Sequence, residues 1–160
     1  MATLKEDIVI SAEWLVKAFA ALDIELDYSV KSVERIETLL SEQFVDGQAI
    51  PDGLFATGLG GKLFAISSYV GEVIIKNTRA TKWETDDDDP EGEVNITLIS
   101  ANGSAMFPAH RIMKRIQNGE EDNVYHYTAL AVRDYMKYEG EIPIDFNTKE
   151  KKIKPWWKIW

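Results

Sequence analysis

The chain has 160 residues, of which 45% are apolar, so it is long enough to form one domain with a substantial hydrophobic core. It contains no cysteine, which excludes disulfides, thiol nucleophiles and cysteine-ligated zinc and suits a reducing cytoplasm, where we expect the protein to lie. The net charge of −9 disfavours nucleic acid as a partner, because phosphate groups repel an acidic surface.

The first half of the chain predicts three helices. Ser11 is expected to cap the first, whose apolar side chains at helical spacing are Trp14, Leu15, Ala18, Phe19 and Leu22. The second is expected to start near Ser29, with an apolar face formed by Val30, Val33, Ile36, Leu40 and Phe44. After a loop at residues 46–58, which is rich in glycine and proline, a third helix is predicted over Leu59–Lys76.

The third helix is expected to be the most buried, and it contains a glycine. Gly71 weakens a helix by roughly 1 kcal/mol relative to alanine, so we expect another element to approach closely there. The apolar period then changes to two: Trp83 lies on a predicted strand at residues 81–85, and a second strand follows at residues 94–98. Asn102-Gly103 predicts a type I′ hairpin turn before a return strand at residues 105–107.

Two more helices complete the prediction. Pro108 suits the first turn of a helix that ends at Gly119 and carries an apolar face of Ile112, Met113 and Ile116. Asp122 is expected to cap the last helix, which ends at Gly140 and has among its inward residues Val124, Tyr127, Ala131, Met136 and Tyr138. The pattern predicts an α+β fold, with about five helices packed around a small antiparallel sheet of about three strands. We expect one domain over residues 1–140 and a tail rich in lysine and tryptophan over residues 141–160.

Several short motifs resemble those of an uncharacterised family of small bacterial domains. They are Asp27-Tyr28-Ser29 with Ser32, Tyr69 with Gly71-Glu72, Trp83, Phe107-Pro108, and Lys114-Arg115 with Asn118-Gly119. The resemblance covers roughly residues 25–135 and implies the fold, with Gly71, Glu72, Trp83, Pro108 and Arg115 in structural roles. Because some members of that family look like neighbours of secreted toxins, the resemblance also implies an immunity protein. It implies no active site.

The side chains that enzymes use for nucleophilic catalysis are sparse. The chain has no cysteine and no Gly-x-Ser-x-Gly elbow, and its two histidines, His110 and His126, fall on separate predicted helices. Asp122 and His126 lie four residues apart and are spaced to share a metal, but a capping carboxylate beside a surface histidine is the favoured interpretation. We therefore expect no catalytic residue, no metal site and no cofactor. The alternative is a small enzyme or ligand-binding domain with a cleft near Glu72, His110 and Arg115.

Two loops partly match ligand-binding motifs. The glycines at positions 58, 60 and 61 lack the Lys-Ser/Thr pair of a phosphate loop, so they favour a flexible approach to a helix. Asp87, Asp89 and Glu91 match the first positions of a calcium-binding loop, but Leu98 stands where a bidentate glutamate is required. A solvated hairpin loop, or a contact surface for a basic partner, is the favoured interpretation.

Two oppositely charged segments are the predicted partner-binding regions. Residues 84–93 contain seven acidic residues and no basic one, and those assigned to partner binding are Glu84, Asp86, Asp87, Asp88, Asp89 and Glu91. Residues 149–158 contain five lysines and one acidic residue, and the last five positions of the chain include Trp156, Trp157 and Trp160. We expect these rings to fold back on the domain, to dock in a partner, or to touch an anionic membrane, in that order of preference.

Together these features predict a non-enzymatic binding protein. Its favoured version is a cytoplasmic bacterial immunity protein, which neutralises a toxin by steering acidic groups onto the basic active surface of that toxin. The expected partner is therefore a basic protein. A membrane is disfavoured, because no apolar stretch approaches ~18 residues and the N-terminus lacks the pattern of a signal peptide. A structural adaptor that uses the tryptophan tail is a third interpretation, and the oligomeric state stays open.

Overall fold

The computed structural model describes the backbone of residues 2–138 and the side chains of residues 2–134. Within that range the fold is α+β, as predicted, with five α-helices and two small antiparallel sheets. The helices are α1 (Leu4–Ala20), α2 (Val33–Gln43), α3 (Leu59–Lys76), α4 (Pro108–Asn118) and α5 (Val124–Tyr138). The strands are β1 (Phe44–Val45), β2 (Gln48–Ala49), β3 (Lys82–Glu84), β4 (Thr97–Ile99) and β5 (Ala105–Met106). Single 3₁₀ turns, η1 (Val30–Ser32) and η2 (Gly119–Asp122), precede α2 and α5.

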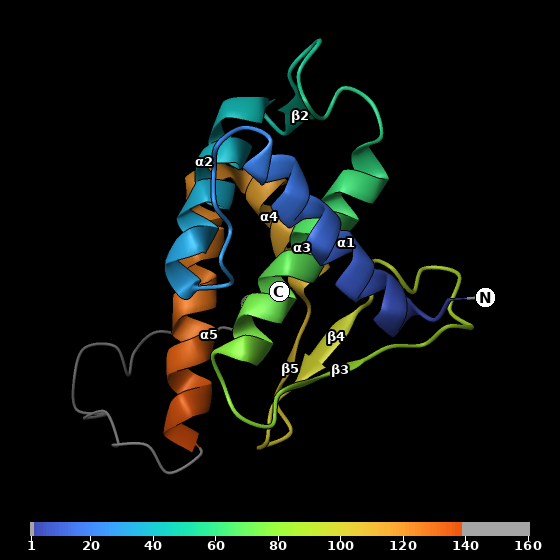
Figure 1. Cartoon of the computed structure of the whole chain (residues 1–160), viewed down its shortest axis with the longest axis vertical. Coiled ribbons are helices and arrows are strands. Elements are labelled where there is room, and N and C mark those ends of the chain that lie inside the picture. The colour runs from blue at the N-terminus through green and yellow to red at the C-terminus, as the bar shows by residue number, and fades with distance from the viewer. Residues whose placement is uncertain (1, 139–160) are drawn as a thin grey trace.

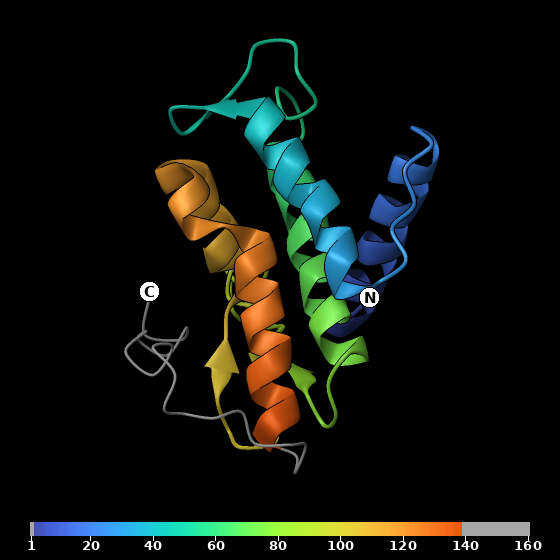
Figure 2. The same ribbon diagram turned by 90° about the vertical axis from the view of Figure 1, so that its left-hand side faces the viewer.

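Helix α3 lies at the centre of the molecule, as its apolar sequence predicts. It contacts α1, α4 and α5, and ten of its residues, from Phe64 to Ile74, are buried. Figure 1 shows α1 crossing in front of α3, with the three-stranded sheet near one end of the helices, and Figure 2 shows α5 on the far side from α1. The long apolar stripe of α3 is buried because other helices cover it on several sides.

The sheet of β3, β4 and β5 contributes a row of buried side chains to the same core. The strand order is β3-β4-β5, and Leu98 pairs with Trp83 on one side and with Met106 on the other. Because side chains alternate between the two faces of a sheet, these three paired residues point to one face. All three are buried, so this is the face that packs on the helical core.

Helix α1 starts seven residues before the predicted cap at Ser11. Its N-cap is Thr3, which forms a capping box with Glu6, and the helix buries Ile8 in the core. Of the predicted apolar face, Leu15 and Phe19 are buried, whereas Trp14 and Leu22 are 49% and 59% exposed. The predicted apolar face of α1 is therefore wider than the face that the core covers. The spacing of apolar residues does not show how much of a helix its neighbours will cover.

The predicted type I′ turn at Asn102-Gly103 is wrong. Gly103 has a φ of 83° and its N–H bonds Ser100 O, whereas Asn102 does not have a positive φ, so the hairpin uses a type I turn followed by a glycine bulge. Two consecutive residues with positive φ occur instead at Asp46 and Gly47, between β1 and β2, in the segment predicted to be a loop. Both turns contain a glycine, but only the backbone angles distinguish their types.

The start of the last helix also differs from the prediction. The N–H of His126 donates to Asn123 Oδ1 at 3.0 Å, so Asn123 caps α5, while Asp122 is buried and paired elsewhere. Met113, predicted on the apolar face of α4, is 41% exposed, whereas Pro108 and Gly119 bound α4 as predicted. The predicted end at Gly140, and the predicted inward side chains of Met136 and Tyr138, lie outside the described residues.

Candidate functional site

The acidic segment joins β3 to β4 and is organised by its own carboxylates. Asp86 Oδ1 accepts a hydrogen bond from the backbone N–H of Asp88 at 2.9 Å, and Asp89 Oδ1 accepts one from that of Glu91 at 2.9 Å. Asp89 Oδ2 also accepts a hydrogen bond from the side-chain amide of Asn95 at 3.0 Å. Bonds of this kind favour a defined turn. They leave exposed most of the predicted partner-binding side chains here, namely Glu84, Asp86, Asp87, Asp88 and Glu91.

A further bond ties the acidic segment to the start of α1. Asp87 Oδ1 accepts a hydrogen bond from the backbone N–H of Leu4 at 2.8 Å. Gly92 packs against the side chain of Leu4, so closely that a Cβ on Gly92 would lie 2.7 Å from Leu4 Cδ1. A carboxylate at a helix N-terminus is stabilised by the unpaired N–H groups and the helix dipole. The segment is therefore held beside the first turn of α1, where Figure 1 shows the loop between β3 and β4.

The hydrogen bonds of Asp89 predict a pH dependence. They lower its pKa below the ordinary value of 3.8, the Asn95 amide having the largest effect. Because the folded-state pKa is the lower one, the stabilisation is present above pH ~4 and is lost as the pH falls through the folded pKa. We expect the Asn95 amide NMR signals to titrate with a midpoint below 3.8, and Asp89→Asn to remove this transition. A midpoint at or above the ordinary value would show that the Asp89–Asn95 bond does not form in solution.

Trp83 makes the close approach that the sequence predicts at Gly71. A Cβ on Gly71 would lie 2.0 Å from Trp83 Cη2, so only glycine leaves room for the ring. The indole Nε1 donates to Glu72 Oε2 at 3.0 Å, and Glu72 is half-buried. The three residues join α3 to the sheet, and Glu72 acts here as an acceptor for the indole.

Arg115 is buried in an ion pair that the sequence did not reveal. Its Nε donates to Glu37 Oε2 at 2.7 Å, and Glu37 Oε1 accepts the backbone N–H of Val124 at 2.8 Å. Glu37 is a charged residue of α2 that is nevertheless buried. It is one turn from Val33 and from Leu40, both buried, and this position within the apolar stripe was the available signal.

A second buried pair uses Asp122, the residue predicted to cap α5. Arg111 Nη1 donates to Asp122 Oδ1 at 2.7 Å, and Asn118 donates to the other carboxylate oxygen at 2.8 Å. The guanidinium also lies 4.8 Å from the ring centroid of Tyr127, whose pKa is raised by burial. Asp122 therefore joins η2 to α4 and lies outside α5, the helix that carries the exposed His126.

The three residues of the alternative cleft have separate partners. Glu72 bonds Trp83, Arg115 bonds Glu37, and His110 Nε2 lies 3.1 Å from Asn95 Oδ1. The pKa of His110 is lowered, mainly by burial and also by the charge of Lys114. Each of the three side chains therefore bonds a residue of another part of the fold. The predicted docking of Trp156, Trp157 and Trp160 lies outside the described residues.

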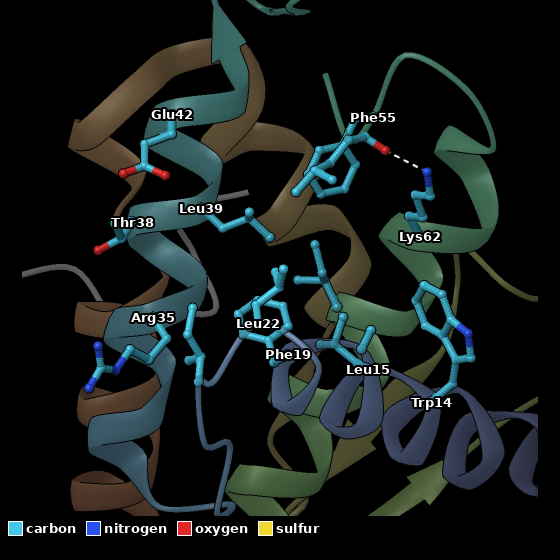
Figure 3. Close-up of a pocket in the computed structure, with 14 residues that line it drawn as sticks. Trp14, Leu15, Phe19, Leu22, Arg35, Thr38, Leu39, Glu42, Phe55 and Lys62 are labelled. Carbon is cyan, nitrogen blue, oxygen red and sulfur yellow. Dashed lines mark hydrogen bonds between the residues drawn. The ribbon is translucent and has the colours of Figure 1, made fainter. Parts of the chain in front are cut away.

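An open pocket that the sequence analysis did not predict lies between α1, α2, α3 and the loop after β2. Its volume is about 410 Å³, within the range of small-molecule sites. The apolar side chains that line it are Trp14, Leu15, Ala18, Phe19, Leu22, Ile24, Leu39, Leu54, Phe55 and Ile66. Figure 3 shows α1 along one side, α2 with Arg35, Thr38 and Glu42 along another, and Lys62 of α3 opposite α2. The exposed Trp14 and Leu22, which the sequence predicts on the apolar face of the first helix, border this pocket.

The fold and these surfaces define a small α+β protein with an ordered acidic loop and an apolar pocket. No protein-family model, curated protein or solved structure matches the chain. None of the helices within residues 2–138 is both long and apolar enough to span a bilayer. Over the described range, no three histidine or carboxylate side chains gather as they would to hold a metal ion.

Proposed function

We propose that the chain is a non-enzymatic protein that binds a basic protein partner, and that this partner is a toxin domain which it neutralises in the bacterial cytoplasm. The observation that carries the proposal is the acidic loop with its exposed carboxylates. The backbone of this loop is ordered by hydrogen bonds that the carboxylates of Asp86, Asp87 and Asp89 accept from backbone N–H groups. A loop ordered in advance loses less conformational entropy on binding. Its charge accelerates encounter with a surface of opposite sign.

The distribution of charge also supports a basic partner. Residues 139–160 contain five lysines and four acidic residues, a net charge of +1, so residues 1–138 carry a net charge of −10. Two arginines there, Arg111 and Arg115, are buried in ion pairs and contribute little positive charge to the surface. The buried pairs join helices to one another, and the exposed carboxylates of the loop are available for a partner.

The loop predicts a salt-dependent association rate. The test compares a loop variant, Glu84→Gln with Asp88→Asn and Glu91→Gln, with a control variant, Glu13→Gln with Glu25→Gln and Glu34→Gln. Both neutralise three exposed acidic residues and retain the carboxylates that order the loop. We expect the loop variant to associate about tenfold more slowly at low salt, the control to change much less, and the difference to vanish at high salt.

The partners to test are the products of the neighbouring genes, measured by surface plasmon resonance on the full chain. Production of the partner alone should stop bacterial growth, and co-production of the chain should restore it. Equal association rates for the two variants would remove the loop from the interface. A bound partner that does not arrest growth would leave a binding protein but contradict the toxin.

A further inference from the structure

The apolar pocket has a property that binding through the acidic loop does not use. Leu15, Phe19 and Ile66 form its buried wall, while Trp14, Leu22 and Leu54 are 49%, 59% and 49% exposed around its opening. Large apolar side chains gathered around one cavity are characteristic of a surface that another molecule covers. The polar side chains of the lining lie at its edges, so its interior suits an apolar chain or ring.

The opening is positively charged on a chain that is strongly acidic. The lining contains two cations, Arg35 and Lys62, and one acidic residue, Glu42. Lys62 Nζ donates to the backbone carbonyls of Leu54 and Thr57, which are neutral acceptors, so its charge is not cancelled and one of its three N–H groups remains. The two cations lie on opposite edges of the pocket in Figure 3, with apolar side chains between them.

Arg35 is the cation best placed to hold an anion. It is exposed, and within the described part of the chain it belongs to no ion pair. The residues three and four positions away are Lys31 and Ser32 of η1 and Thr38 and Leu39 of α2, none of which is acidic. Its aliphatic stem lines the pocket while its guanidinium stays in water, an arrangement typical of arginine at the edge of an apolar surface.

We propose that this pocket binds a free amphiphilic carboxylate, of the class of medium-chain fatty acids. The alkyl chain lies against Leu15, Phe19 and Ile66, and the carboxylate lies at the opening. The guanidinium of Arg35, which points away from the apolar side chains in Figure 3, turns on its flexible stem to accommodate two carboxylate oxygens. Lys62 adds positive charge from the opposite edge. This site is separate from the acidic loop and does not depend on the proposed toxin partner.

Calorimetric titration of the full chain tests the site, with decanoate below its micelle concentration as the probe. We expect one saturable site, with decanoate binding about tenfold more tightly than octanoate, because each buried methylene contributes to affinity. Decanol, which lacks the charge, should bind more weakly, and decyltrimethylammonium more weakly still. Arg35→Gln should bind decanoate no more tightly than decanol while decanol binding is retained. The matched control is Lys31→Gln, an exposed cation of η1 outside the pocket, and it should behave as wild type.

A second variant locates the site. Leu22→Glu adds an acidic side chain at the opening, at a position exposed enough for the fold to accept it, and should abolish decanoate binding with an unchanged circular dichroism spectrum. Three results would overturn the proposal: no saturable binding, wild-type preference for decanoate in Arg35→Gln, or binding unaffected by Leu22→Glu. Two further results would also overturn the proposal, because they assign the pocket to a different occupant. Binding seen only after replacing Trp156, Trp157 and Trp160 with serine points to the C-terminal segment, and binding lost as the chain dimerises points to a second copy.

Discussion

Trp83→Ala is expected to lower the free energy of unfolding by ~3–5 kcal/mol, the range found for large buried aromatic side chains. Trp83 is 8% exposed, its backbone pairs with Leu98 in the sheet, and its ring lies over Gly71 of α3. Removing the ring leaves a cavity between the sheet and the central helix. It also removes the donor for Glu72 Oε2. The loss therefore combines apolar burial with a hydrogen bond.

The same contact makes Gly71→Ala destabilising, although alanine favours a helix. The added Cβ would lie 2.0 Å from Trp83 Cη2 and 2.2 Å from Cζ2, so a rigid ring or a helix backbone has to move. Overpacking of this kind costs about 1–3 kcal/mol, which exceeds the gain of roughly 1 kcal/mol in helix propensity. Gly60→Ala is the matched control: Gly60 lies in the same helix, and a Cβ there has no neighbour within 4 Å. We expect it to leave the stability unchanged or to raise it.

Urea unfolding followed by far-UV circular dichroism measures all of these variants and their combination. In the Trp83→Ala background, Gly71→Ala should no longer destabilise, because the atoms that it meets are absent. The coupling energy between the two positions should then be comparable to the cost of Gly71→Ala alone. If Gly71→Ala and Gly60→Ala have the same effect in the wild-type background, the ring does not lie on the helix as described.

The central part of this fold follows from local patterns in the sequence. The boundaries of α3 were predicted without error, because its apolar residues recur at helical spacing over eighteen residues. Gly71 then indicated a close neighbour, and Trp83 provides it. For α1 the capping box of Thr3 and Glu6 was also readable, but the apolar run after Ser11 favoured a later start. Local patterns therefore predict the elements better than they predict where those elements meet.

The candidate sites depend on contacts between distant parts of the chain. The exposure of the acidic segment could be predicted, because a run of like charges is stable only in water. Its attachment to α1 through Asp87 and Leu4 spans 83 positions, and no local pattern indicates it. The pocket has the same origin, since its walls come from three helices and a loop. The buried arginines of α4 look like surface residues until their acidic partners are known.

The pair of Glu37 and Arg115 carries the second large prediction. Glu37→Gln is expected to destabilise the protein by ~3–5 kcal/mol, because it leaves a buried guanidinium without a countercharge. The side chains of Arg115 and Glu37 are only 5% and 10% exposed, so water cannot replace the lost partner. Glu37 also accepts the first backbone N–H of α5 at Val124, and the pair therefore connects α2, α4 and α5.

A double variant distinguishes the cost of leaving one buried charge unpaired from the cost of losing the pair as a whole. Glu37→Leu with Arg115→Met removes both charges and should cost much less than the two single changes added together, since an apolar pair of similar size fits a buried site. A residual loss of ~1–3 kcal/mol is expected, because the N–H of Val124 then lacks its carboxylate acceptor. The control is Asp134→Asn in the pair with Arg133, whose side chains are about one-third exposed and 3.7 Å apart, and it should cost under ~1 kcal/mol. Urea unfolding distinguishes the cases: if Glu37→Gln is as mild as Asp134→Asn, the buried pair does not hold the three helices together, and apolar packing alone positions them.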